Sequence, residues 1–219
     1  MSFDLQLTRV VPASYSARFP IQEAEVVAYV ERAPDMRMVP RLTPGYPGRF
    51  IDVDGGGWTR LTDGMIAVKN PDEGIYRRMA AMAAALDAWM LVESVQFVIV
   101  REDRVSEREV GLADLPHPRY FVARDAPIGA DEWAGAVAGM DDFAWETRIK
   151  ARLPSGREWI ACPPVACWNG HPSGEPVPFH LDEDEGVDVW QPDALTLDRM
   201  RTLAAVLGGW VSDDSGKRI

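Results

Sequence analysis

The chain has 219 residues, of which 47% are hydrophobic and 26% are charged, the composition of a folded globular protein rather than of a disordered or fibrous one. Its formal net charge of -11 disfavours binding to nucleic acid or anionic lipid, because contacts to phosphate need Lys and Arg. Residues 1–5 lack the basic segment of a secretory signal, and no uncharged apolar stretch is long enough to span a membrane. We therefore expect a cytoplasmic protein, in which Cys162 and Cys167 stay reduced.

The acidic residues are spread unevenly along the chain. Residues 1–110 contain 13 Lys and Arg against 16 Asp and Glu, whereas residues 111–219 contain 10 against 18. An acidic surface favours a basic protein partner. The alternative is that the charge serves only solubility.

The first 61 residues predict one helix among several strands. Phe3, Leu5 and Leu7 alternate with polar residues, which is typical of a half-buried strand. A helix is predicted from Ile21 to Arg32, because apolar residues recur along one side of it and Pro34 follows it. The remaining predicted strands lie at 36–42, 49–53 and 58–61, the last two joined as a hairpin.

The stretch from Gly64 to Trp89 predicts a strand followed by a helix. After the strand at 65–69, Asn70 is a good N-cap, and Glu73 can complete a capping box. Methionine, alanine and leucine then recur at helical spacing up to Trp89. We interpret this stripe as core packing rather than as a cofactor-binding surface. A buried strand at 95–100 and a linker follow.

The same order of elements returns after the linker, with strands and a helix at 120–123, 128–137, 145–153 and 157–162. Met79, Ala83, Leu86 and Trp89 recur 121 residues later as Met200, Ala204, Leu207 and Trp210. Trp168 lies 110 residues after Trp58, and pairing these two places the 11 extra residues of the second half within Asn169–Gly186.

These matches predict an α+β fold with an internal duplication. The predicted architecture is two tandem β-α-β-β-β-α repeats, each an antiparallel sheet with two helices packed on one face. The first repeat covers residues 1–111, a linker covers 112–118, and the second repeat covers 119–219 with an insertion at about 169–186. Since folding explains what the repeats share, we expect function where they differ.

Four side chains of the second repeat are of the types that bind zinc: Cys162, Cys167, His171 and His180. Their spacing disagrees with a zinc site, because prolines occupy two of the four positions between the cysteines, and eight residues separate the histidines. The alternative is a pair of buried thiols near a hairpin. We predict no metal and no cofactor, and the chain contains no motif that singles out a catalytic residue.

A cluster of charged and polar residues lies inside and next to the insertion: His180, Asp182, Glu183, Asp184, Glu185 and Asp188. It lacks the glycine and the closing glutamate of an EF-hand calcium loop. Two interpretations remain, a solvated turn between strands and a partner surface whose carboxylates pair with Arg or Lys. With His171, these residues form the predicted partner-binding site.

Several short motifs resemble a family of small bacterial proteins. The chain contains Lys69-Asn70-Pro71-Asp72 before a helix with Met79, the pair Glu132-Trp133, and Asp213-Asp214-Ser215-Gly216 near its end. This combination resembles immunity proteins of polymorphic toxin systems, which bind and block a cognate toxin inside the producing cell. The last motif departs from the family's Gly-Asp-Asp-Gly-Glu, and Gln191 stands where the second helix would have an asparagine cap.

The resemblance implies a non-catalytic inhibitor whose partner is a protein toxin with a basic surface. A metal-dependent or carboxylate-based enzyme centred on the second repeat is the first alternative. A scaffold or oligomerisation module is the second, and a homodimer is compatible with either binding role.

Overall fold

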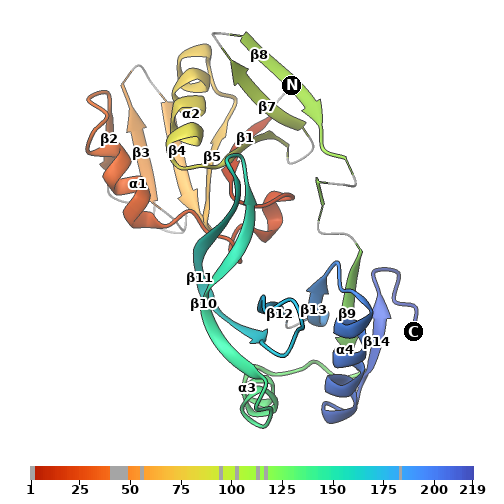
Figure 1. The fold of residues 1–219 in the computed structure, drawn as a ribbon. Helices are drawn as coiled ribbons and strands as arrows, with labels where there is room; N and C mark the ends of the chain where they lie inside the picture. Colours follow the sequence, from red (N-terminus) through yellow and green to blue (C-terminus); the bar gives the residue numbers. More distant parts are fainter. Residues whose placement is uncertain are drawn as a thin grey trace. The chain divides into compact units, whose positions relative to one another are not determined.

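The computed structural model describes residues 3–39, 49–54, 57–93, 96–101, 104–111, 114–115, 118–182 and 184–219. It divides the chain into two compact units (Figure 1). Unit 1 comprises residues 1–115 and 150–163, and unit 2 comprises residues 116–149 and 164–219. Residues 150–163, which the sequence analysis assigns to the second repeat, therefore belong to unit 1. None of the described helices is both long and apolar enough to cross a membrane.

Unit 1 is built on an eight-stranded antiparallel sheet of order β2-β3-β4-β5-β1-β6-β7-β8. Its elements are β1 (Asp4–Thr8), η1 (Ala13–Tyr15), α1 (Glu23–Val30), β2 (Met36–Val39), β3 (Arg49–Val53), β4 (Gly57–Thr62), β5 (Met65–Lys69), α2 (Glu73–Ala85), β6 (Trp89–Val92), β7 (Gln96–Arg101) and β8 (Arg104–Glu109). Leu5 and Leu7 of the central strand pair with β5 and β6 and share one buried cluster with Val26 of α1 and Met82 of α2. Both helices therefore cover the same face of the sheet.

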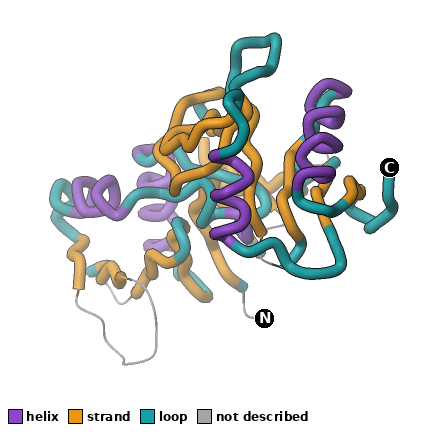
Figure 2. The backbone as a smooth tube through the Cα atoms, turned by 90° about the horizontal axis from the view of Figure 1, so that it is seen from below, coloured by secondary structure: helices purple, strands orange, loops and turns teal. Residues whose placement is uncertain are grey.

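The second sheet has the order β10-β11-β12-β13-β9-β14. Its elements are β9 (Arg119–Ala123), α3 (Ala130–Ala138), β10 (Phe143–Leu153), β11 (Gly156–Trp168), β12 (Val177–Asp182), β13 (Gly186–Trp190), α4 (Ala194–Val206) and β14 (Trp210–Asp213). Val122 of β9 pairs with Val187 and Val211 and packs with Trp133 of α3 and Met200 of α4. The carboxyl-terminal end of the chain lies beside α4 in both views (Figures 1 and 2).

The α+β class with antiparallel sheets is confirmed, but the element order is longer than predicted. Among the described residues, each half runs strand, helix, four strands, helix, strand, whereas the predicted β-α-β-β-β-α repeat has three strands between its helices and ends with the second helix. The six strands β2-β3-β4-β5-β1-β6 follow one another in the same relative order as β10-β11-β12-β13-β9-β14. Unit 1 adds the hairpin β7–β8 at its edge, of which only the first strand was predicted.

The predicted N-cap of α2 was wrong by two residues. Asp72 caps the helix, because its carboxylate accepts the Ile75 backbone N–H at 2.8 Å. Asn70 adopts the left-handed φ of +47°, which asparagine tolerates better than most residues, and its side chain accepts the Phe3 backbone N–H. The same arrangement recurs in unit 2, where Asp193 caps α4.

Both long helices end earlier than predicted. Asp87 and Gly208 have left-handed φ values of +49° and +67°, which stop α2 and α4. Trp89 and Trp210 are then the first residues of β6 and β14 instead of the last residues of helices. Each tryptophan follows the last apolar residue of its helix, Leu86 or Leu207, by three positions. This is a helical spacing, so the pattern alone did not show that the helix had already ended.

Two ion pairs occur at matching positions in the two halves. Arg9 binds Glu25 and the Leu86 carbonyl, and Arg124 binds Glu132 and the Leu207 carbonyl. In addition, Arg78 pairs with Asp35 as Arg199 pairs with Asp142. In both halves the arginine directly after the first strand connects the start of the first helix to the end of the second.

The predicted location of the extra length was only partly right. Trp168 ends β11, the counterpart of β3, whereas Trp58 lies in β4, so these tryptophans are not equivalent. The backbone N–H of Asp54 donates to the Asp35 carbonyl, and the backbone N–H of Asn169 donates to the Asp142 carbonyl, so these two bonds correspond. Asp35 and Asp142 are 107 residues apart, whereas Asp54 and Asn169 are 115 residues apart. Eight extra residues therefore lie in the β10–β11 hairpin, before the predicted insertion.

Candidate functional site

The acidic turn, residues 182–185, joins β12 to β13. The carboxylate of Asp182 accepts the backbone N–H groups of Asp184 and Glu185 at 3.1 and 3.2 Å, so this side chain shapes the turn. Gly186 follows with a φ of +106°, and a Cβ there would lie 2.3 Å from the Val122 carbonyl oxygen. The turn is thus fixed at both ends. Asp184 and Glu185 are exposed, and Glu183 lies outside the described residues.

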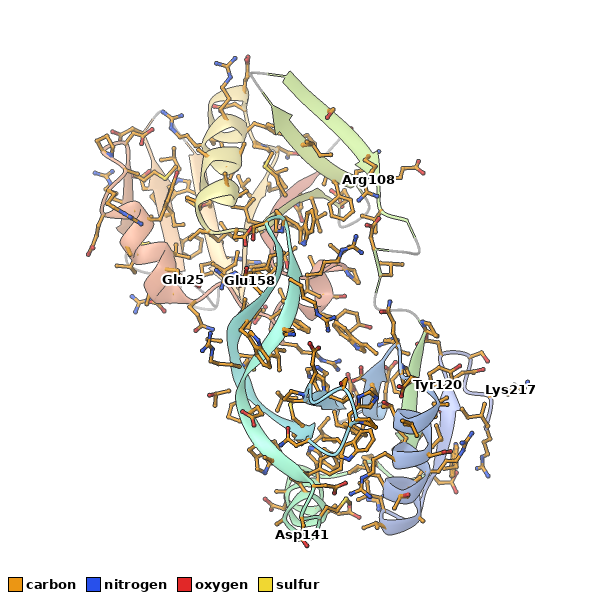
Figure 3. All side chains as sticks on the ribbon, in the orientation of Figure 1. Glu25, Arg108, Tyr120, Asp141, Glu158 and Lys217 are labelled. Atoms are coloured by element: carbon orange, nitrogen blue, oxygen red, sulfur yellow. The ribbon has the colours of Figure 1, made fainter. Side chains whose placement is uncertain are left out.

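Arg119 connects the acidic turn to a second acidic segment. Its guanidinium lies 2.9 Å from the carboxylate of Asp214 and 3.7 Å from that of Glu185, and it lies over the Phe121 ring. Figure 3 labels two residues near them in the sequence, Tyr120, which directly follows Arg119, and Lys217, which lies three residues after Asp214. The structure therefore brings the carboxyl-terminal Asp213-Asp214 into the same site as the turn.

Asp213 shapes its own turn in the same way as Asp182. Its carboxylate accepts the Ser215 hydroxyl and the backbone N–H groups of Ser215 and Lys217. These bonds, first of all the one from the Ser215 side chain, lower the pKa of Asp213 below its usual value. We call Asp184, Glu185, Asp213 and Asp214 the acidic surface. Sequence reasoning had assigned only the first two to a site, because strand pairing between β9 and β14 cannot be read from local motifs.

His180 and Asp188 do not lie on the exposed turn. They face each other across β12 and β13, on the sheet face opposite Val187 and Val189, and are 8% and 0% exposed. The indole N–H of Trp190 donates to Asp188 at 2.6 Å, and the His180 ring lies 5.7 Å from the Trp190 ring. These two predicted partner-binding residues are buried in strands, because the polar run continues past the turn into the sheet.

His171 is also separate from the acidic surface. Its Nε2 lies 2.9 Å from Asp193, the N-cap of α4, its Nδ1 lies 2.7 Å from the Ser173 hydroxyl, and its ring packs edge-on against Trp168. The bond from the Thr196 N–H and then the bond from His171 lower the pKa of Asp193 to about 2. His171 therefore attaches the β11–β12 loop to the start of α4.

His171 contacts both Ser173 and Asp193. These three residue types also make up a catalytic triad of serine nucleophile, histidine base and orienting acid. The Ser173 backbone N–H also points at Nδ1, at 3.2 Å, and the Ser173 hydroxyl accepts the Glu175 N–H. These local bonds fold the loop around the imidazole. We interpret the three residues as a structural clamp.

The candidate zinc ligands are divided between the units. Cys162 belongs to unit 1, whereas Cys167, His171 and His180 belong to unit 2, and both cysteines are buried thiols. Among the described residues, no three His, Cys, Asp or Glu side chains are grouped as a metal ion would require.

The charge of the molecule is concentrated in unit 2. Unit 1 contains 16 Lys and Arg against 18 Asp and Glu, and unit 2 contains 7 against 16. Their formal net charges are therefore -2 and -9. The exposed carboxylates of the acidic surface thus belong to a unit that repels other anions and attracts cationic surfaces over several ångströms.

No family model, curated protein or solved structure matches this chain.

Proposed function

We propose that the chain is a non-catalytic binding protein that neutralises a protein toxin with a basic surface, as the resemblance to immunity proteins implies, and that it acts in the cytoplasm. The acidic surface of unit 2 is the proposed contact. One observation carries the proposal, the exposure of Asp184 and Glu185 on a turn that Asp182 and Gly186 hold in place.

A fixed turn is suited to binding because little conformational freedom is lost when a partner docks. Carboxylates on such a turn form charge-assisted hydrogen bonds with Arg and Lys. The charge of unit 2 would accelerate the encounter with a basic partner and make the association rate fall with added salt. His180 and Asp188 support the turn from the strands instead of contacting the partner.

The matching ion pairs support an evolutionary proposal as well. We infer that the two halves descend from one duplicated α+β unit, since Arg9, Arg78, Arg124 and Arg199 make equivalent bonds in each. Within the acidic surface, Asp184 and Asp214 have the carboxylates Asp63 and Glu93 as counterparts, whereas Glu185 and Asp213 stand where the first half has Gly64 and Val92.

The test is neutralisation of a toxic domain encoded next to this chain in its source genome. Co-expression with the native chain is expected to restore growth, and the double variant Asp184→Asn, Glu185→Gln is expected to bind the purified domain about tenfold more weakly, mainly through a slower association. The matched control is Asp131→Asn, Asp141→Asn, which removes the same charge from exposed residues of the same unit.

The two double variants separate a local contact from a general charge effect. Equal weakening by both would assign binding to net charge and not to the turn. Unchanged binding by the turn variant, at low and at physiological salt, would overturn the proposed contact. A chain that restores growth against no neighbouring toxic domain would overturn the function.

A further inference from the structure

The β10–β11 hairpin is the one pair of described strands that passes from one unit into the other. Both strands change unit within it, between Ile149 and Lys150 on β10 and between Pro163 and Pro164 on β11. Proline has no backbone N–H, and since consecutive residues of a strand direct their N–H groups to opposite sides, one of the two prolines removes a donor from the β10–β11 ladder at that boundary. The hairpin therefore lacks a backbone donor where it changes unit.

The part of the hairpin within unit 1, residues 150–163, has the pattern of a docked segment. We call it the hairpin tip. Ala151 and Leu153 on one strand and Ile160 and Cys162 on the other are between 4% and 9% exposed, and they alternate with exposed residues. This alternation is that of a strand pair with one buried face. The tip thus contributes apolar side chains to the interior of unit 1.

Polar contacts to three residues of unit 1 fix the position of the tip. Asp87, in its left-handed conformation at the end of α2, accepts both the backbone N–H and the hydroxyl of Ser155. The indole N–H of Trp89 donates to the Arg152 carbonyl at 2.9 Å, and the Gln22 side-chain amide donates to the Ala161 carbonyl. The contacts from Asp87 and Trp89 define one register for the turn of the hairpin.

The charges of the tip complement those around it. The tip contains Lys150, Arg152 and Arg157 against Glu158. On the body of unit 1 it meets Asp87, and Arg152 also helps to lower the pKa of Asp114, for which the hydrogen bond from Arg108 is the main cause. The polar groups described as contacting the tip, Gln22, Asp87 and Trp89, all lie within residues 1–115.

We propose that residues 1–115 accept the hairpin tip of a second copy of this chain in place of their own, so that two chains exchange hairpins and form a reciprocal dimer. Gln22, Asp87 and Trp89 would bind the same groups of the tip in both cases, and the tip leaves unit 1 on two adjacent strands, so exchange requires a change of conformation only at that boundary. The partner is a second copy because the tip and the groups that contact it, Gln22, Asp87 and Trp89, all belong to this sequence. This inference does not depend on the proposed function.

The test uses a cysteine pair that forms a disulfide between chains only if the hairpin is exchanged. One tagged chain has Asp87→Cys and a second, differently tagged chain has Ser155→Cys, and the two are mixed, unfolded, refolded over a range of protein concentrations and oxidised. We expect a covalent dimer that contains both tags and increases with concentration. Random pairing would give both tags in about half of all dimers.

The control replaces Asp87→Cys by Asp141→Cys, an exposed position in unit 2, and is expected to give no dimer with both tags. A second pair, Gln22→Cys with Ala161→Cys, repeats the experiment at the other side of the tip in case Asp87→Cys does not fold. The single chain that contains both Asp87→Cys and Ser155→Cys reports the internal contact. If it closes within one chain at every concentration while neither mixed pair links two chains, the proposal is overturned.

Discussion

The β4–β5 turn of unit 1 and the β12–β13 turn of unit 2 lie at corresponding places in their sheets, but they differ in how closely the rest of the unit packs against them. In unit 1 the hydroxyl of Ser16 donates to the Asp63 carbonyl, and the Ile21 N–H donates to the Gly64 carbonyl, so the preceding segment covers the turn. In unit 2, Asp184 and Glu185 are exposed. Asp63 and Asp184 are both exposed, so the two turns differ at the next residue, where Gly64 packs closely against Ser16 and Pro20 and Glu185 is exposed.

The hairpins that precede these turns differ as well. The β10–β11 hairpin is eight residues longer than its counterpart, and its tip completes unit 1. Unit 1 thus depends on a segment from far along the chain, whereas unit 2 carries the excess charge. Under the proposed function, changes in the hairpin tip should affect stability, and changes in the acidic surface should affect binding.

The largest expected effect comes from removing an apolar side chain of the hairpin tip. Leu153→Ala should destabilise unit 1 by about 3 kcal/mol, because a buried leucine is lost and a cavity remains. Hydrogen exchange resolved by peptide should show faster exchange in residues 1–115. Leu195→Ala is the control, the same truncation at a residue that is 50% exposed in unit 2. Equal effects of both variants would contradict the assignment of the tip to unit 1.

Arg9 and Arg124, which make matching bonds in the two halves, should contribute differently to the free energy of unfolding. Arg9→Ala should cost about 2 kcal/mol, since a side chain only 7% exposed gives up charge-assisted bonds to Glu25 and the Leu86 carbonyl. Arg124→Ala should cost less, because Arg124 is 21% exposed and water replaces part of its bonds. Urea unfolding of the two variants measures the difference. A larger loss for Arg124→Ala would reverse the comparison.

The helix caps provide a smaller effect and a pH dependence. Asp72→Ala should cost about 1 kcal/mol, and Asp193→Ala should cost more because His171 also binds that carboxylate. The folded pKa of Asp193, about 2, lies below its ordinary 3.8. The contribution of the ionised Asp193 to folding stability is therefore fully present at pH values above the ordinary pKa of 3.8 and is lost as the pH falls toward 2. Acid titration should show the stability difference between Asp193→Ala and the native chain shrinking between about pH 5 and pH 2. A difference that stays constant would exclude the ionised carboxylate as its cause.

The smallest effect on stability should come from the proposed contact itself. Asp184→Asn should change the free energy of unfolding by less than about 0.5 kcal/mol, because an exposed side chain away from caps and cores contributes little. Thermal unfolding checks this value. Asp182→Asn is the matched comparison, since its carboxylate holds the turn. A large loss for Asp184→Asn would mean that Asp184 has a structural role.

Local patterns were sufficient for much of the fold. The alternation of Leu5 and Leu7 and the apolar spacing around Met79 predicted elements that the structure contains, because side-chain period alone distinguishes strand from helix. Asn70 was misassigned as a cap since asparagine favours both caps and left-handed turns, and only the contact with Phe3 decides between them. Such a contact between residues far apart in the sequence leaves no local signal.

The candidate site was predictable only in part for the same reason. The exposed Asp184 and Glu185 follow from a polar run between strands, but the burial of Asp188 depends on which sheet face it occupies. Arg119 and Asp214 join the site through the pairing of β9 with β14. The hairpin tip was missed because pairing Trp58 with Trp168 concealed the eight extra residues.

The division of unit 1 between residues 1–115 and 150–163 has a consequence for synthesis of the chain on the ribosome. Domains usually fold as they emerge, the amino-terminal one first. Here the amino-terminal unit cannot be completed until the chain has grown past Pro163, well into the elements of unit 2. During that interval the surface that receives Leu153 and Ile160 stays uncovered, so the nascent chain is most exposed to aggregation and to chaperones just before the β10–β11 hairpin is made.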